Sequence, residues 1–144
     1  MLTVEEATDA NDELVSAFAR LVPQLSSSSS PPAMSQVAEM IASPTTTVFL
    51  ARNDDGTIVG TLTLVVFRIP TAIRAWIEDV VVDEDARGTG AGEALNRAAL
   101  ALARQKGAKT VDLTSRPGRE AANRLYQRLG FKRRDTNVYR YDLL

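Results

Sequence analysis

Three strand-like runs follow one another in this 144-residue chain, and no helical segment separates them. The first, 45–52, is rich in β-branched residues, and Asn53-Asp54-Asp55-Gly56 after it is a hairpin turn signal. The second, 57–67, contains Gly60, which predicts a bulge or a close backbone contact. The third, 73–82, ends in three valines. Because strands joined by short turns pair antiparallel, these runs predict three antiparallel strands.

Helical periodicity is found before these strands, and helical and strand-like segments alternate after them. In the first helical segment apolar residues recur at i, i+3, i+4 and i+7, as Leu14, Ala17, Phe18 and Leu21. Asp9 or Asp12 is the expected cap of this helix. The predicted helices are 9–25, 33–42, 90–106 and 117–129, and the further predicted strands are 3–7, 110–114, 131–134 and 137–143.

The element order is therefore β-α-α-β-β-β-α-β-α-β-β. It predicts an α/β (α+β) fold in which one mixed sheet of about seven strands is flanked by about four helices. A chain of this length is one domain by the usual size relation, so we expect a single domain over residues 1–144.

Two residue types with wide chemical use are missing from the chain. There is no cysteine, which excludes disulfides and thiolate chemistry, and no histidine, which removes the commonest zinc ligand and the usual general base. We therefore expect no metal site. The chain starts without a basic segment or an apolar signal region, and no apolar run approaches the roughly 18 residues of a membrane helix. We expect a cytoplasmic protein with no membrane partner.

Charge is unevenly distributed along the chain although its net value is only −1. Residues 1–96 carry 5 basic and 14 acidic side chains, and residues 97–144 carry 12 basic and 4 acidic ones. Either the two halves neutralise each other in the folded protein, or the basic half meets an anionic ligand. Nucleic acid is not the expected partner, because the domain as a whole is not basic.

A glycine-rich segment, Arg87-Gly88-Thr89-Gly90-Ala91-Gly92, lies between a predicted strand and a predicted helix. Glycine allows close backbone approach and positive φ, and the first N–H groups of a helix favour an anion. Arg87 adds a planar cation suited to phosphate oxygens. The segment predicts a diphosphate site, unless it is only a tight strand-to-helix turn.

Two other nucleotide motifs fit this segment poorly. A Walker loop needs Gly-Lys-Ser/Thr after four spacer residues, and that sequence is absent. A Rossmann fingerprint matches Gly88 and Gly90, and Asp112 resembles its ribose-binding acid, but Glu93 stands at the place of the third glycine. A Rossmann turn also follows its strand at once, whereas residues 83–86 intervene here.

Three segments in order resemble the GNAT superfamily of acyl-CoA-dependent N-acyltransferases. Arg87-x-x-Gly90-x-Gly92 fits the family pattern Q/R-x-x-G-x-G/A, and Ile77-Glu78-Asp79-Val80-Val81-Val82 precedes it at the usual short spacing. Leu125-Tyr126-Gln127-Arg128-Leu129-Gly130-Phe131 is similar to the family signature LYxxxGF. The resemblance covers residues 45 to 143 most clearly. It implies one N-acetyltransferase domain over residues 1–144, with a splayed sheet.

The resemblance also implies acetyl-CoA as the cosubstrate and assigns residues to it. It implies that the diphosphate is bound by Arg87, Gly88, Thr89, Gly90, Ala91 and Gly92. It also implies that the pantetheine arm is bound by the backbone of Val80, Val81 and Val82. An N–H near Val80 is the implied donor to the thioester oxygen. Many members carry Asn seven residues before the tyrosine, where this chain has Arg119, and Asn123 is its nearest substitute in sequence. Arg116 or Arg119 is an alternative phosphate contact.

An N-acyltransferase must remove a proton from its amine substrate before the amine attacks. Without histidine, Glu78 and Asp79 are the candidate bases, directly or through water; they point to opposite faces of a strand unless a bulge intervenes. Glu78 is preferred, because it shares a face with Trp76. Tyr126 is the candidate acid for the departing thiolate, an assignment that comes from the family signature.

The acceptor is not readable beyond a primary amine on a small molecule or peptide. Arginines near the expected acceptor site favour an anionic acceptor, whereas the acidic N-terminal half favours a polyamine, an aminoglycoside or a lysine side chain. A non-catalytic acyl-CoA-binding or regulatory module is the alternative function, and a nucleic-acid or protein-interaction domain is a third. A homodimer is compatible with the resemblance, and no sequence feature decides it.

Overall fold

A computed structural model describes all 144 residues, in two compact units, Met1–Leu113 and Thr114–Leu144, which are described separately. The first unit contains every strand and most helices: β1 (Thr3–Glu6), α1 (Asp12–Leu25), α2 (Met34–Ala42), β2 (Thr46–Arg52), β3 (Ile58–Ile69), β4 (Ala72–Val82), the 3-10 turn η1 (Glu84–Ala86), α3 (Ala91–Gln105) and β5 (Thr110–Asp112). The second unit contains α4 (Glu120–Leu129). None of these helices combines the length and the apolar character needed to cross a membrane.

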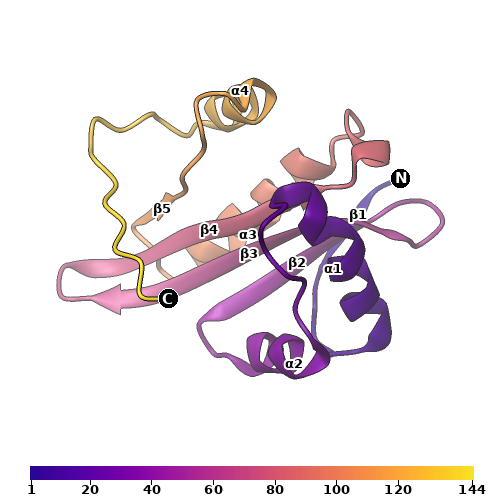
Figure 1. Cartoon of the computed structure of the whole chain (residues 1–144). Helices are drawn as coiled ribbons and strands as arrows, with labels where there is room; N and C mark the ends of the chain where they lie inside the picture. Colours follow the sequence, from indigo (N-terminus) through magenta and orange to yellow (C-terminus); the bar gives the residue numbers. More distant parts are fainter. The chain divides into compact units, whose positions relative to one another are not determined.

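The five strands form one mixed sheet in the order β1-β2-β3-β4-β5 (Figure 1). The first four strands pair antiparallel with their neighbours, and β5 pairs parallel with β4 after the crossover through α3. The predicted mixed sheet with four helices is therefore confirmed.

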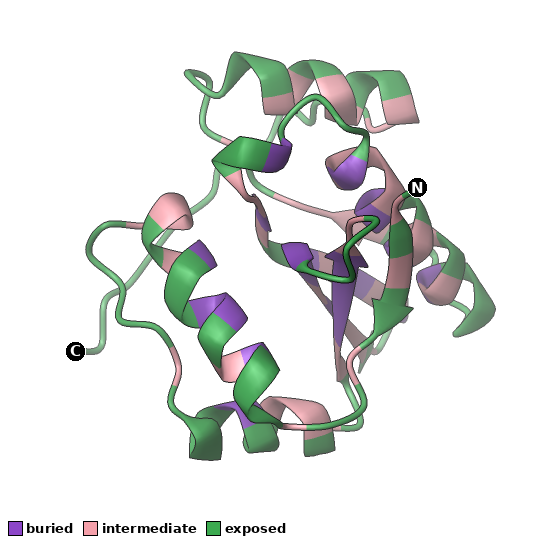
Figure 2. Ribbon diagram, turned by 90° about the vertical axis from the view of Figure 1, so that its right-hand side faces the viewer, coloured by how far each residue is buried: buried purple, intermediate pink, exposed green.

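The sheet is covered by helices on both faces. On one face, α1 and α2 pack their apolar stripes against β2, β3 and β4 in a core cluster of Leu14, Ala17, Phe18, Leu21, Val37, Val48, Leu50, Ile58 and Val81. Helix α3 lies on the other face, where a Cβ added to Gly60 would meet Leu95 Cδ1 at 3.1 Å. Figure 2 shows the buried segments of this unit on the strands and on one side of the helices. The close contact predicted at Gly60 is confirmed.

Helix α1 begins one residue after its cap, Asn11, whose side-chain oxygen accepts from the Leu14 N–H over 2.9 Å. The prediction that Asp9 or Asp12 caps this helix is therefore wrong. Asn11 has the extended backbone that a cap requires, with φ −132° and ψ 172°, whereas Asp12 is already the first helical residue.

The prediction of about seven strands is also wrong, because the sheet has five. The expected strands at 131–134 and 137–143 are not formed, and the observed element order ends at α4. A strand is stabilised by pairing and by one buried face, and residues 132–144 are exposed along their whole length. The residue types of this segment were therefore not sufficient to make a strand.

Candidate active site

The last six residues of β4 have a strand partner on one side only. Antiparallel pairing with β3 extends along β4, but the parallel pairing with β5 ends at Trp76, which lies opposite Asp112. From Ile77 to Val82 the edge of β4 that faces away from β3 has no paired strand. Backbone N–H and C=O groups on such an edge can pair with an extended ligand. The limited pairing of β4 with β5 agrees with the splayed sheet that the resemblance implies.

A bulge interrupts β4 within this stretch. Thr63 of β3 lies opposite Glu78, but Thr61, only two residues away, lies opposite Val81, so one extra residue of β4 is accommodated between them. Asp79 has φ +49°, which is the one positive φ in the chain outside glycine. Such a conformation is uncommon, and Asp and Asn tolerate it better than most residues.

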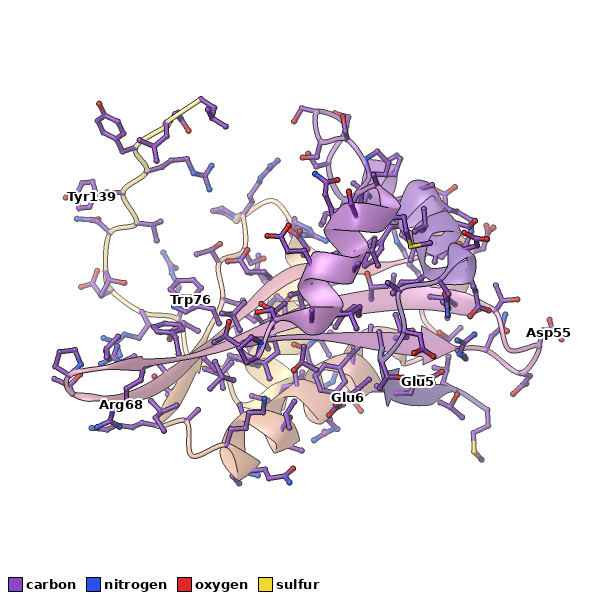
Figure 3. The ribbon with its side chains drawn as sticks, turned by 90° about the horizontal axis from the view of Figure 1, so that it is seen from below. Glu5, Glu6, Asp55, Arg68, Trp76 and Tyr139 are labelled. Carbon is purple, nitrogen blue, oxygen red and sulfur yellow. The ribbon has the colours of Figure 1, made fainter.

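The bulge determines which side chains share a face of the sheet. Trp76 and Glu78 are two residues apart and point to the same face. Val81 joins them there, because Thr61 and Thr63 also share a face, and Val81 packs in the core cluster beneath α1 and α2. In Figure 3 the Trp76 side chain lies on the side of the sheet that carries these helices. Glu78 is exposed on this face, next to the covered core.

The segment after β4 makes a short turn and presents the glycine loop (Arg87–Gly92). Ala86 and Ala91 are buried at its two ends, whereas Arg87, Gly88, Thr89 and Gly90 are exposed. The Thr89 hydroxyl donates to the Ala86 carbonyl oxygen, which closes the turn. The predicted loop between strand and helix is thus present, with its outer residues directed to solvent.

Backbone conformation explains the glycines of this loop. Gly88 has φ +80° and Gly90 has φ +89°, a region that side chains other than glycine rarely adopt. A Cβ at either position would meet no atom within 4 Å, so the requirement comes from φ and not from crowding.

Helix α3 begins at the glycine loop without a side-chain cap, since Gly90 is its N-cap residue. The first N–H groups of the helix, at Ala91 and Gly92, therefore have no side-chain acceptor. Together with the helix dipole and the exposed Arg87, they favour an anion at this end of α3. The loop has the chemistry of a diphosphate site.

Two further candidate residues, Tyr126 and Asn123, lie on α4 in the second unit. The Tyr126 ring packs edge-on against Phe131, with 5.7 Å between ring centroids and 74° between planes. Burial raises the pKa of the Tyr126 phenol above its usual value, and the positive charge of Arg119 partly opposes this. The phenol therefore stays protonated at neutral pH.

Asn123 has a local structural contact. Its side-chain nitrogen donates to the Arg116 carbonyl oxygen over 2.9 Å, which fixes the turn that precedes α4. The Arg119 N–H donates to the same oxygen over 3.0 Å. This contact gives Asn123 a role in the fold of its own unit, and any cofactor contact of Asn123 stays a prediction.

Two residues of α1 contact the turn before the glycine loop, and no sequence pattern had indicated them. Arg20 donates to Asp83, and Gln24 accepts from the Glu84 N–H, across 63 and 60 positions of the chain. The sequence shows only the apolar stripe of this helix, and Arg20 and Gln24 lie outside that stripe, so no local signal identified them.

The described residues contain no group of three or more Asp or Glu side chains placed to hold a metal ion.

Comparison with known proteins identifies the family. The model of the acetyltransferase (GNAT) family matches residues 13–131, which is most of the chain. The chain therefore belongs to the GNAT acetyltransferase family, whose members use acetyl-CoA. No curated protein sequence matches the chain.

Solved structures with the same fold cover nearly the whole chain. An acetyltransferase from Trypanosoma brucei is 28% identical, with a TM-score of 0.81, over 99% of this chain and 100% of its own. A transcriptional regulator from Bacillus halodurans is also 28% identical, with a TM-score of 0.79 and the same coverage. An aminoglycoside acetyltransferase from an uncultured soil metagenomic sample, in complex with sisomicin, is 22% identical, with a TM-score of 0.83, over 99% of this chain and 96% of its own.

Proposed function

We propose that the protein transfers an acetyl group from acetyl-CoA to a primary amine, by direct attack of the amine on the thioester in a ternary complex. The observation that carries this proposal is the succession, within 16 residues, of an exposed carboxylate, an open strand edge and an uncapped glycine-rich helix start, from Ile77 to Gly92. The family match over residues 13–131 supports the same activity.

The residues of this stretch fit the parts of acetyl-CoA. The glycine loop and the N–H groups that begin α3 suit the diphosphate, and the backbone of Val80, Val81 and Val82 suits the amide-containing pantetheine arm. Acetyl-CoA supplies the activated acyl group as a thioester. The bulge at Asp79 takes the Val80 backbone out of the regular register with β3, so its N–H is the candidate donor to the thioester oxygen.

Glu78 is the proposed base. It is exposed on the same face as Trp76, at the start of the open strand edge. An ammonium group has a pKa near 10.4, so a carboxylate that accepts its proton, directly or through water, makes the amine nucleophilic at neutral pH. Asp79 is the alternative base, since the bulge gives its side chain a different direction from that of a regular strand residue.

Tyr126 is the proposed acid for the leaving thiolate. A tyrosine phenol is protonated at neutral pH, as a proton donor must be, and burial raises the pKa of Tyr126 further. The assignment to this reaction rests on the family signature around Tyr126. A structural neighbour at 22% identity is an aminoglycoside acetyltransferase in complex with sisomicin, a likeness that supports the fold alone, and we propose no acceptor narrower than a primary amine.

Calorimetric titration with CoA tests the cofactor site. The natural protein should bind with a dissociation constant in the micromolar range, about −8 kcal/mol, and Arg87→Ala/Gly90→Val should lose measurable binding. Arg104→Ala/Gly56→Val is the matched control. It removes an exposed arginine at the far end of α3 and strains a hairpin glycine of similar φ, +80°. The control should bind like the natural protein.

The result that excludes the proposal is absence of CoA binding by the folded natural protein. Where binding is found, release of the CoA thiol from acetyl-CoA in the presence of a panel of amines identifies the acceptor class. Binding without thiol release for any amine would favour the non-catalytic module.

A further inference from the structure

The C-terminal half of α1 is hydrogen-bonded to the first residue of β3 and to the segment that follows β4. Arg20 Nη1 donates to Asp83 Oδ2 over 3.1 Å, and Nη1 and Nη2 both donate to the Ile58 carbonyl oxygen, over 3.2 and 3.1 Å. One helical turn later, Gln24 Oε1 accepts from the Glu84 N–H over 2.9 Å. Gln24 Nε2 also donates to the Arg20 carbonyl oxygen over 3.2 Å, so the two side chains belong to one network.

Asp83 is the centre of this network and the start of the turn that presents the glycine loop. Its N–H donates to the Val59 carbonyl oxygen over 2.8 Å, and its second carboxylate oxygen accepts from the Asp85 N–H over 3.1 Å. The Asp83 carbonyl oxygen accepts from the Ala86 N–H over 2.8 Å. The direction in which the chain enters Arg87 is thus set by Asp83, and Arg20 holds the Asp83 carboxylate.

Arg20 also neutralises a negative charge close to the glycine loop. Asp83, Glu84 and Asp85 form an acidic run directly before a loop suited to an anion, and like charges repel a diphosphate. The Asp83 side chain is only 14% exposed, so water screens it poorly, and its ion-pair partner is Arg20. An unpaired Asp83 would both weaken the turn and oppose the ligand.

We infer that Arg20 and Gln24 are positioning residues for the cofactor, which act through Asp83 and Glu84 on the shape and the local charge of the glycine loop. This inference rests on the proposed function, because it concerns the binding of CoA. Neither residue belongs to a motif of the sequence. Both are placed by α1, a helix distant in sequence from the loop.

The test compares Arg20→Met and Gln24→Leu with a matched control, Arg52→Met. Arg52 is bonded to the same helix through Glu13, with Nη2 2.8 Å from a carboxylate oxygen, but it connects α1 to Glu5 of β1 and to the Gly56 carbonyl oxygen, not to the turn at Asp83. The control therefore removes a side-chain contact of α1 while keeping the side chains of Arg20, Gln24 and Asp83, although the Arg52 backbone lies opposite Ile58 in the sheet. Arg20→Lys is a rescue variant. The lysine ammonium group can pair with Asp83, but it lacks the second nitrogen with which the guanidinium also reaches the Ile58 carbonyl oxygen.

Two readouts are needed on each folded variant. In calorimetric titration, Gln24→Leu, which loses the neutral and exposed bond with the Glu84 N–H, should raise the dissociation constant of CoA about threefold. Arg20→Met, which loses the charged partner of Asp83, should raise it about tenfold or more. Arg20→Lys should recover part of this loss. In hydrogen exchange of the ligand-free protein, amides of residues 83–92 should exchange faster in both variants. Arg52→Met should lower the thermal midpoint without changing either readout.

The inference is overturned where the natural protein binds CoA and both variants bind it equally well, or where Arg52→Met weakens binding as much as they do. Those outcomes leave the proposed function standing. Failure of the natural protein to bind CoA overturns the proposed function and this inference together.

Discussion

Glu78 and Asp79 are neighbours in the sequence, but the bulge gives them different surroundings. Glu78 keeps the pairing with Thr63 and the face it shares with Trp76, whereas Asp79 is at the bulge with a positive φ. At the scale of residues, the backbone irregularity therefore separates the two candidate bases. A regular strand would have kept the simple alternation of faces.

Substitution of each acid distinguishes them. Glu78→Gln should lower kcat/KM about 10²-fold or more, since a general base contributes about 10²–10⁴-fold, and the acidic limb of the pH profile should disappear. Asp79→Asn keeps a residue that tolerates positive φ and should have a smaller effect. The measurement is thiol release from acetyl-CoA between pH 5 and 9, once an acceptor is known. Full activity of Glu78→Gln at every pH would assign the role elsewhere.

Tyr126 makes a prediction at high pH. Its folded-state pKa is raised by burial, so a proton-donating phenol should hold kcat up to a pH above the ordinary tyrosine value near 10, and activity should decline beyond it. Tyr126→Phe should lower kcat about 10²-fold and leave the dissociation constant of CoA unchanged.

The stability of the protein should follow the same shift with a definite sign. Below pH 10 the phenol is neutral in folded and unfolded chains, and it contributes no pH dependence. Above that pH the unfolded chain ionises first, so the natural protein loses stability that Tyr126→Phe retains. Equal urea midpoints for both proteins at pH 7 and a gap at pH above 10 would show this. If Tyr126→Phe released the CoA thiol as fast as the natural protein, Tyr126 would be a packing residue only.

At the scale of elements, the first strands and helices were predictable from the sequence because each follows a local pattern. The stripe of Leu14 to Leu21 and the hairpin at Asn53-Asp54-Asp55-Gly56 are confirmed, with strand and helix ends within a few residues of the prediction. The cap of α1 was missed because Asp9, Asn11 and Asp12 are all good caps and only backbone conformation selects one.

The rest of the fold depends on contacts that local patterns do not contain. Strands were expected at 131–134 and 137–143, but pairing decides whether a strand forms, and neither strand is formed here. In the candidate site, the glycine loop was readable because positive φ and glycine go together. The bulge at Asp79 and the contacts of Arg20 and Gln24 were not readable, because they join segments far apart in the chain.

Gly60 makes a prediction about the packing of β3 against α3. An added Cβ would lie 3.1 Å from Leu95 Cδ1 and 3.2 Å from the Val81 carbonyl oxygen, and the backbone oxygen cannot easily move. Gly60→Ala should therefore lower the free energy of unfolding by about 1–3 kcal/mol, measured by urea denaturation. Gly118→Ala is the control, because its Cβ would meet nothing within 4 Å and its φ is not positive. An equal loss in both variants would contradict the packing argument.

At the scale of the whole molecule, the charge boundary of the sequence does not coincide with the structural units. Met1–Leu113 carries 9 basic and 15 acidic side chains, and Thr114–Leu144 carries 8 and 3. Within the first unit, acids are neutralised by local pairs, with Arg52 bound to Glu5 and Glu13, and Arg20 bound to Asp83. These pairs screen individual acids but leave the net charges unchanged, at −6 (9 − 15) for the first unit and +5 (8 − 3) for the second.

The two units should also differ in their resistance to protease. Trypsin needs several residues of extended, accessible chain around its cleavage site, and Lys132, Arg133 and Arg134 are exposed outside any helix or strand. Arg52, Arg68 and Arg74 lie in paired strands, where cleavage requires the sheet to open. Arg87 is exposed too, but it lies in a short turn that the bond from the Thr89 hydroxyl to the Ala86 carbonyl oxygen closes. We therefore expect brief digestion to cut first in the C-terminal segment, after Lys132, Arg133, Arg134 or Arg140.

Mass spectrometry of the first products identifies the cut directly, and far-UV circular dichroism of the purified fragment shows whether the sheet persists. The expected fragment keeps all five strands and both packed faces of the sheet. A first cut after Arg52 or Arg68 would contradict this prediction, because it would mean that the sheet of Met1–Leu113 opens to trypsin before the C-terminal segment is cleaved.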